Sequence, residues 1–310
     1  MYPNFPMIGH LRIPILTLLV VSSVACEATA QDNTNKYGMK ASPLAGTVYV
    51  IEGAGGNITV SVGEDGVVMV DDEVGPLVEQ TMAALRGISD KPLKFVISTH
   101  YHDDHTGGNA YFQKLATIIA QENVRRRMKS GGISGNGSSV HEEVKLAAPE
   151  ALPRITFNDE VVLHLNGEDI RVVHFPAAHT DGDAVVFFPR ANVVHMGDIF
   201  VTYGFPFIDI DSGGSIDGMI DAVEKVIARV PPDVKIIPGH GPVSTIAHLG
   251  AYLEMLKATR NAVSTALAGG KTLDQMKRAR ILGSWKKYSG DFVSEDAFLE
   301  TLYNSLRKSN

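Results

Sequence analysis

The feature that most constrains this chain is a run of metal-binding residue types between Thr99 and Gly108. Residues 100–105 (HYHDDH) hold three imidazoles and two carboxylates, and such a group cannot pack into an apolar core without partners. Apolar residues 95–98 predict a buried strand that ends just before the run, and Gly107-Gly108 predict a helix that opens just after it. Alternation at the strand end sends His100 and His102 to the same side. The motif therefore predicts a site for zinc or a similar divalent ion.

The residues of this motif are too few to complete the coordination of a metal site. More ligand residues are therefore expected further along the chain. Three residues fit: His179 in AHTDG, Asp198 in MGD and His240 in PGHG. Each follows an apolar strand pattern and lies in a glycine-flanked turn, from which a side chain can reach a cleft. Each is weak evidence alone, but together with residues 100–105 they predict one shared site.

The periodicity of the apolar residues predicts an α/β fold. Short β-branched runs and helical spacings alternate as strands, helix, strand and helix, twice over. The expected strands cover 47–51, 58–62, 67–70, 95–98, 118–119, 193–194 and 236–237, with helices over about 76–87, 215–227 and 246–267. Turns are expected at Asn166-Gly167 and Asp181-Gly182 between later strands. Two sheets packed face to face with helices outside would satisfy this order. We interpret the Gly/Ser-rich stretch 130–139 as a flexible surface loop rather than as a rim over the active site.

Composition excludes several classes of protein. The chain has 310 residues, of which 44% are hydrophobic, so it can bury a sizeable core. Its net charge of −7 argues against nucleic-acid binding, and we interpret Arg125–Arg127 as a solvated helix face because no aromatic residue interleaves with it. A single cysteine excludes a disulfide framework within one chain.

The N-terminus resembles an export signal. Arg12 precedes the apolar run 13–25, which is too short to span a bilayer, and Ala28-Thr29-Ala30 matches a small-x-small cleavage pattern. Residues 1–30 are therefore predicted to be a signal peptide, with residues 31–310 as the mature chain in the periplasm or outside the cell. Residues 23–26 (SVAC) also resemble a lipobox, which would make Cys26 a lipidated N-terminus and the protein a lipoprotein. No other membrane segment is predicted.

The pattern His-x-His-x-Asp-His, followed by His, Asp and a final His, resembles that of the metallo-β-lactamase superfamily. The similarity covers roughly residues 45–245, and helices over about 245–310 would be an addition to the domain. The resemblance implies a four-layer αββα sandwich and a site for two metal ions. Zinc is the expected metal, although iron and manganese also accept a His/Asp set.

The resemblance also implies a role for each candidate ligand. The first metal would be held by His100, His102 and His179, and the second by Asp104, His105 and His240, with Asp198 bridging the two. Either Asp71 or Asp72, at the end of the strand before the first helix, matches the family's buried carboxylate that supports a ligand; an ordinary turn aspartate is the alternative. We interpret His164, His174 and His195 as packed or ligand-supporting residues in strands.

Two branches of the family compete. The most familiar β-lactamases carry Cys where this chain has Asp198, and many have a Lys that binds the lactam carboxylate, which residues 199–204 lack. The full set of seven ligands with a bridging Asp is more similar to glyoxalase II and lactonases. The sequences Gly55-Gly56-Asn57-Ile58 and Val70-Asp71-Asp72, together with the predicted export, favour the lactamase-like branch.

The expected function is hydrolysis of a small carbonyl substrate. A water between two divalent ions has its pKa lowered from about 15.7 toward roughly 7, and the resulting hydroxide can attack a polarised carbonyl. Asp104 is predicted to orient that nucleophile, and Tyr203 is a candidate donor to the oxyanion, with a core or rim tyrosine as the alternative. A cyclic amide, and first a β-lactam, is the leading substrate class.

Three alternatives remain open at this point. One is a lactone or thioester hydrolase with the same site. Another is a non-haem iron enzyme on the same fold, such as a sulfur dioxygenase, although oxygen-reducing di-iron relatives usually have Glu at the position of His102. The third is a metal-binding protein without turnover. The sequence does not indicate an oligomeric state.

Overall fold

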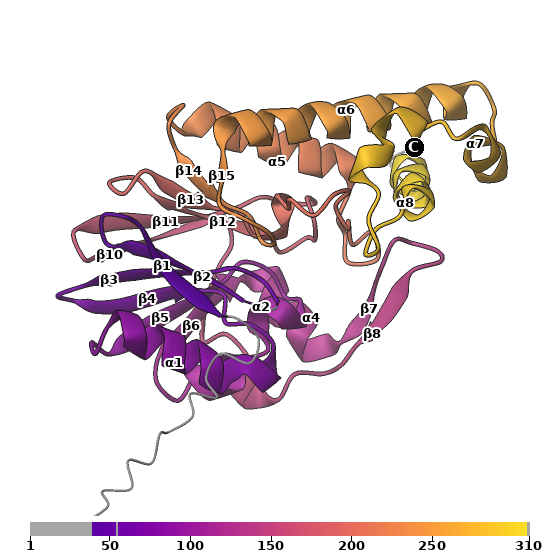
Figure 1. Ribbon diagram of the computed structural model, residues 1–310. Helices are drawn as coiled ribbons and strands as arrows, with labels where there is room; N and C mark the ends of the chain where they lie inside the picture. Colours follow the sequence, from indigo (N-terminus) through magenta and orange to yellow (C-terminus); the bar gives the residue numbers. More distant parts are fainter. Residues whose placement is uncertain (1–38, 54, 309–310) are drawn as a thin grey trace, which may run out of the picture. The chain divides into compact units, whose positions relative to one another are not determined.

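The computed structural model describes residues 39–53 and 55–308 (Figure 1). The predicted signal peptide and the lipobox-like sequence at Cys26 lie outside the described residues. Two main sheets form the centre of the described chain. The first contains, in spatial order, β1 (Lys40–Ala45), β2 (Val48–Glu52), β3 (Ile58–Gly63), β4 (Gly66–Val70), β5 (Leu93–Ser98), β6 (Thr117–Gln121) and β9 (Ile155–Phe157). The second contains β10 (Glu160–Leu165), β11 (Glu168–His174), β12 (Ala184–Phe188), β13 (Val193–His195), β14 (Lys235–Ile237) and β15 (Ser244–Thr245).

Both faces of the central strands are buried, and β4 shows why. Val67 and Met69 of β4 pack toward the first outer helix layer, whereas Val68 and Val70 pack between the two sheets. A strand buried on both faces reads as a continuous apolar run rather than as an alternation. The GVVMV sequence of β4 therefore belongs at the centre of a layered fold.

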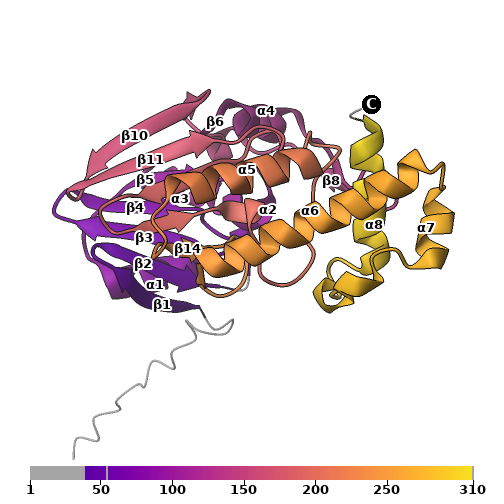
Figure 2. The ribbon, with the colours of Figure 1, turned by 90° about the horizontal axis from the view of Figure 1, so that it is seen from above.

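Helices cover the outer faces of both sheets, which gives four layers (Figures 1 and 2). On the first sheet lies α1 (Val78–Ile88), whose Met82 and Leu85 are buried against it. On the second sheet lie α5 (Ile216–Arg229) and α6 (Ile246–Ala268). Ser215 caps α5 by accepting a hydrogen bond from the Gly218 amide at 2.9 Å. The predicted αββα sandwich is confirmed.

The remaining elements are short helices and one hairpin. The helices are η2 (Gly75–Leu77), α2 (Asp103–Thr106), α3 (Asn109–Phe112), α4 (Glu122–Ser130), η3 (Pro149–Ala151), η4 (Gly197–Ile199), α7 (Leu273–Ala279), η5 (Gly283–Tyr288) and α8 (Glu295–Lys308). The hairpin pairs β7 (Gly132–Gly135) with β8 (His141–Val144). No helix among residues 39–53 and 55–308 is long and apolar enough to cross a membrane.

Two expectations about local structure were wrong. Most of the predicted flexible loop 130–139 is the first strand and the tip of the β7–β8 hairpin. The Gly/Ser composition did not predict the hairpin, because contacts to distant segments hold it in place rather than its own apolar side chains. The Asp181-Gly182 turn is also not a tight hairpin turn, since residues 175–183 form a longer connection between β11 and β12. The Asn166-Gly167 turn joins β10 and β11 as predicted.

The last helices reach toward the hairpin. Figure 2 shows α6 extending beyond the sheets toward α7 and α8. The Glu300 carboxylate of α8 accepts a hydrogen bond from Ser139 at 2.8 Å, and the Asn304 side chain donates one to the Asn136 carbonyl at 3.0 Å. The hairpin tip is thus held by helix α8, more than 160 residues further along the chain.

Candidate metal centre

All seven predicted ligands lie together, and they come from both sheets. His100 follows β5, and His102 and His105 lie at the start and within the short helix α2. His179 lies in the connection between β11 and β12, Asp198 in η4 after β13, and His240 in the turn between β14 and β15. In the second sheet β11, β13 and β14 run in the same direction, so the segments that follow them emerge at one end of the sheet, where they meet the segment after β5 of the first sheet.

The first group of ligand atoms has the spacing of a metal site. His102 Nδ1 lies 3.0 Å from His100 Nε2 and 3.0 Å from His179 Nε2, and Asp198 Oδ2 lies 3.8 Å from His179 Nε2. Ligand atoms about 2.0–2.1 Å from a tetrahedral zinc ion are about 3.3 Å apart. The residues of this group therefore fit a zinc ion.

The second group shares the same carboxylate. His240 Nε2 lies 3.1 Å from Asp104 Oδ2 and 3.4 Å from His105 Nε2. Asp198 Oδ1 lies 3.3 Å from His105 Nε2 and 3.4 Å from His240 Nε2. This oxygen is buried without a hydrogen-bond partner in the described structure. An orphaned carboxylate oxygen between two imidazoles is explained by a cation, so this group also fits a metal ion.

Hydrogen bonds on the far side of the rings fix which nitrogen faces the site. His105 Nδ1 lies 2.7 Å from Asp71 Oδ2, and His179 Nδ1 lies 2.9 Å from the Phe207 carbonyl. Each ring then donates through Nδ1 and keeps the lone pair of Nε2 for a metal. Of the two carboxylates expected to support a ligand, Asp71 is the one placed to do so.

Asp71 is itself held in a network. Its carboxylate accepts hydrogen bonds from the Thr99 amide at 2.7 Å and the Thr99 hydroxyl at 2.9 Å. His195 Nε2 lies 3.4 Å from Asp71 Oδ2, while its Nδ1 lies 2.7 Å from the Thr59 hydroxyl. The expectation for His195 thus agrees with its place behind a ligand. His164, in contrast, is exposed and pairs only with Asp169 on the surface of β10 and β11.

The electrostatics of the two groups differ. Burial, together with His105 and His102, holds the pKa of His100 well below its usual value, and burial with His102 lowers the pKa of His179 to about 4. These rings are neutral near pH 7 and offer free lone pairs. Burial opposes protonation of His240, but the adjacent Asp198 and Asp104 outweigh it and raise its pKa to about 10. Burial opposes ionisation of Asp198, but His240 and His105 keep its pKa well below its usual value.

One glycine is required by the closeness of the backbone to Asp198. A Cβ on Gly239 would lie 1.9 Å from Asp198 Oδ1, which no substitution can accommodate without moving one of the two segments. The Gly239-His240 turn is held by Asn57, whose side chain donates to the Pro238 carbonyl at 2.9 Å and to the Gly241 carbonyl at 2.8 Å. Asn57 follows the glycines before β3 and ties the first sheet to a ligand of the second.

Sequence reasoning missed Asp209. Its buried carboxylate lies 3.1 Å from His102 Nε2, and it accepts hydrogen bonds from the Tyr101 hydroxyl at 2.5 Å and the Gly135 amide of the hairpin at 2.9 Å. Burial opposes its ionisation, but His102 and the other donors hold its pKa below the usual value. An acidic residue inside the apolar run FPFIDID was the available signal, because a charge in such a run needs partners.

Two further expectations concern residues at the edge of the site. Tyr203 lies with its ring 5.8 Å from the His240 ring, so it is at the wall of the site. Its role as an oxyanion donor stays a prediction. The interpretation of Arg127 as part of a solvated face was wrong: this half-buried residue forms a two-pronged ion pair with Asp181 at 2.6 and 2.7 Å. Periodicity could not show this because Asp181 lies on a distant loop.

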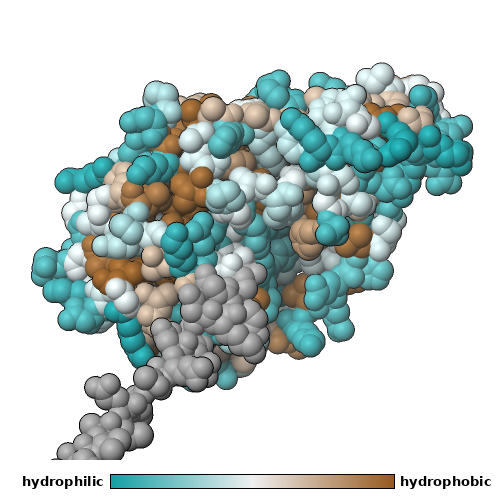
Figure 3. Space-filling view, in the orientation of Figure 1, coloured by the Kyte–Doolittle hydropathy of each residue, from teal (hydrophilic) through white to brown (hydrophobic). Residues whose placement is uncertain are grey.

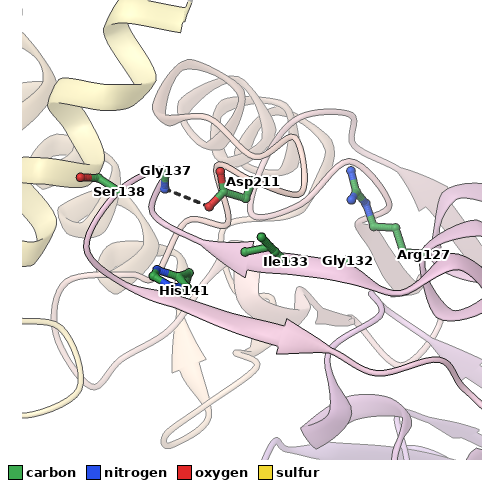
Figure 4. Close-up of a pocket in the computed structure, with 7 residues that line it drawn as sticks. All are labelled: Arg127, Gly132, Ile133, Gly137, Ser138, His141 and Asp211. Atoms are coloured by element: carbon green, nitrogen blue, oxygen red, sulfur yellow. Dashed lines mark hydrogen bonds between the residues drawn. The ribbon is translucent and has the colours of Figure 1, made fainter.

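A separate concavity lies beside the hairpin and contains none of the seven ligands (Figure 4). It has a volume of about 550 Å³ and is lined by Arg127, Gly132, Ile133, Gly137, Ser138, His141 and Asp211. The Gly137 amide donates to the Asp211 carboxylate at 3.3 Å. The convergent imidazoles and carboxylates, rather than this concavity, carry the chemistry.

Comparison with known proteins identifies the family of the chain and agrees with the fold. Residues 42–240 match the model of the metallo-β-lactamase superfamily, and the chain belongs to this superfamily. It is thus a metal-dependent hydrolase by class, acting on a small molecule.

The similar proteins are distant and varied. The metallo-β-lactamase IND-1 of Chryseobacterium indologenes is 23% identical over 57% of this chain and 68% of its own length. The linear primary-alkylsulfatase of a Pseudomonas strain is 25% identical over 64% of this chain but only 44% of its own length. Among solved structures, a metallo-β-lactamase from Pontibacter korlensis covers 71% of this chain and 99% of its own, with a TM-score of 0.60 and 16% identity. These likenesses show the fold and leave the substrate open.

Proposed function

We propose that the protein is an exported dinuclear zinc hydrolase that opens a cyclic amide, with a β-lactam as the first substrate to test. The observation that carries this proposal is the arrangement of Asp198, whose two oxygens face two different ligand groups. A carboxylate shared in this way suits a pair of ions, since each group then has three further ligands. Export is supported by the signal-like residues 1–30.

Two zinc ions bound there would supply a Lewis acid for the carbonyl and a water that ionises near neutral pH. Two residues of the chain, Asp104 and Tyr203, are then placed to orient the attacking water and the substrate carbonyl. Burial opposes ionisation of Asp104, but His105 and His240 lower its pKa to about 2. Asp104 is therefore ionised at neutral pH, so its carboxylate can bind a metal ion and accept a hydrogen bond that orients a water. Burial raises the pKa of Tyr203, so its hydroxyl keeps its proton and remains available as a donor.

The choice of a β-lactam is supported by the similar proteins named metallo-β-lactamases, from Chryseobacterium indologenes and from Bacteroides fragilis. It is tested by nitrocefin hydrolysis with the purified, zinc-loaded mature chain, with and without a chelator. Turnover that the chelator abolishes is the expected result. A zinc-loaded protein with two bound ions and no turnover would contradict the lactam assignment.

The bridging role is tested separately by Asp198→Asn, which keeps the size of the side chain and removes its charge. We expect the bound metal to fall below two equivalents and activity to fall by more than the roughly 100-fold typical of losing an outer partner. Metal content is measured by plasma mass spectrometry. His164→Asn, on the exposed surface, is the control and should keep both ions. Two retained ions with full activity in Asp198→Asn would overturn the proposal.

A second candidate substrate class is a lactone or thioester. The observation that favours it is the segment 199–204, which has no Lys to bind a lactam carboxylate and instead carries Tyr203 beside His240. Chelator-sensitive hydrolysis of an uncharged lactone, in the absence of nitrocefin turnover, would select this class.

A further inference from the structure

Three aromatic side chains lie in contact at the edge of the metal centre. We call Tyr203, Phe207 and Phe292 the aromatic wall. The Phe292 ring lies 5.4 Å from the Tyr203 ring at 89° and 6.3 Å from the Phe207 ring at 59°. Tyr203 and Phe207 come from the segment after η4, whereas Phe292 comes from the loop between η5 and α8. The C-terminal helices thus supply one member of the wall.

The aromatic wall borders both ligand groups. The Phe207 ring lies 6.0 Å from the His179 ring and 6.1 Å from the His102 ring, beside the first group. The Tyr203 ring lies 5.8 Å from the His240 ring, beside the second group. A molecule held against this wall is therefore next to the atoms where a substrate would react.

Phe292 is left uncovered. Its exposed fraction is 71%, the largest among the exposed large hydrophobic residues of the described chain, and it is the single aromatic residue in that set. In the face shown in Figure 3, hydrophobic residues form separate patches between hydrophilic ones. Phe292 is not an isolated exposed residue, since its ring continues into those of Tyr203 and Phe207 beside the metal centre. Covering such a continuous aromatic surface with a ligand removes apolar area from water.

We propose that the aromatic wall binds an aryl substituent of the substrate. This inference rests on the proposed function for the position of the reacting bond, and it adds the substrate's chemical class. The Tyr203 and Phe292 rings form an edge-to-face pair, whereas the Phe207 and Phe292 rings are tilted, and both pairs have centroid spacings at which aromatic rings attract each other. A further ring placed against Phe292 can adopt the same edge-to-face geometry. Residues 199–204 contain no Lys or Arg, so this segment offers apolar contact rather than a cation.

The test uses thiols, which bind a zinc centre through sulfur whether or not a substrate is known. Benzyl mercaptan, cyclohexylmethanethiol and ethanethiol are titrated into the zinc-loaded full chain by calorimetry. Benzyl mercaptan and cyclohexylmethanethiol carry a six-membered carbon ring on the same CH₂–SH arm, and only the first ring is flat and aromatic. We expect benzyl mercaptan to bind about three- to tenfold tighter than the saturated ring.

Phe292→Ala and Phe292→Leu should remove this preference, while the affinity for ethanethiol stays unchanged. Leu115→Ala, at an exposed apolar residue outside the aromatic wall, is the matched control and should keep the preference. Equal affinities of the wild type for benzyl mercaptan and ethanethiol would overturn the subsite. Equal affinities for the two rings would overturn its aromatic character.

The outcome is separable from that of the proposed function. A preference for benzyl mercaptan without hydrolysis of any carbonyl substrate would contradict the hydrolytic proposal and keep the aryl subsite. Hydrolysis of a carbonyl substrate without a preference for benzyl mercaptan would support the hydrolytic proposal and overturn the aryl subsite. The Phe292 variants also carry a circular-dichroism spectrum as a folding control, since the loop lies beside the buried Val293 and Phe298.

Discussion

Protonation of His240 makes metal binding at this centre depend on pH. Asp198 and Asp104 lie 3.4 and 3.1 Å from His240 Nε2, and despite burial they raise its pKa to about 10. The same nitrogen faces the second ligand group. A metal ion that binds there must displace this proton, because a ligating imidazole has to be neutral.

We therefore predict that the apparent metal affinity rises with pH between 6.5 and 8.5. Below a pKa of about 10 the ring is protonated, so each unit of added pH favours the metal by up to about tenfold for one displaced proton. Competition with a chromophoric chelator at pH 6.5, 7.5 and 8.5, corrected for the chelator's own protonation, measures this slope. His240→Asn should make the slope shallower. A wild-type affinity that does not change with pH would disprove the displacement.

The ligands could be predicted from the sequence because four of them form a dense run of donor residues in 100–105, and the other three each lie in a short glycine-flanked turn after an apolar strand. Asp209 and the Arg127–Asp181 ion pair could not be predicted in this way. Their roles depend on contacts between loops that are distant in the sequence. Periodicity records the face of an element that is buried, but it does not record which distant segment covers that face. The layers could be predicted because strand and helix patterns alternate twice along the chain, an order that two sheets with helices outside satisfy, and because the resemblance implies a four-layer sandwich.

At the scale of elements, the β7–β8 hairpin is attached to the metal centre through one carboxylate. Asp209 contacts both the Gly135 amide of β7 and Nε2 of His102, and the Ser134 hydroxyl lies 3.3 Å from that same nitrogen. The hairpin position and the orientation of a ligand are therefore coupled. The Gly/Ser composition of residues 130–139 gave no sign of this, because a backbone amide and one serine hydroxyl make the contacts, and neither produces an apolar pattern.

We predict that Asp209→Asn weakens binding of one metal equivalent by about 10- to 100-fold, the usual effect of losing a partner behind a ligating imidazole. An amide cannot accept from the His102, Gly135 and Tyr101 donors together, since one of its two groups is a donor itself. Stepwise metal titration is the measurement. Ser139→Ala, which removes the contact of the hairpin tip with Glu300, serves as the control and should leave both affinities unchanged. Equal losses in the two variants would refute a role of Asp209 in positioning His102.

At the scale of the whole described chain, the ligand groups cross-link the two sheets. Each sheet is built from one continuous stretch of sequence, with the first sheet ending at Phe157 and the second beginning at Glu160. His100, His102, Asp104 and His105 follow a strand of the first sheet, whereas His179, Asp198 and His240 belong to the second. Metal binding should therefore stabilise the contact between sheets, in addition to the apolar core that lies between them.

We predict that removing the metal lowers the melting temperature. Free metal at 100 times its dissociation constant adds about 2.7 kcal/mol to the free energy of unfolding, which corresponds to roughly 5 °C for a chain of this size. Scanning calorimetry with zinc and with excess chelator measures the difference. The variant His102→Ala should show a smaller shift than the wild type. An unchanged melting temperature after chelation would contradict the cross-link.

The division of ligands between the sheets has a consequence for biosynthesis. Each group takes two imidazole or carboxylate donors from the first half of the chain, and its third donor and the shared Asp198 from the second half. A nascent or truncated chain that ends before His240 contains every strand of the first sheet, yet it cannot complete the second group. Capture of both ions then has to wait until the strands of both sheets have been synthesised, and shorter products are left unable to hold the ions on which the reaction depends.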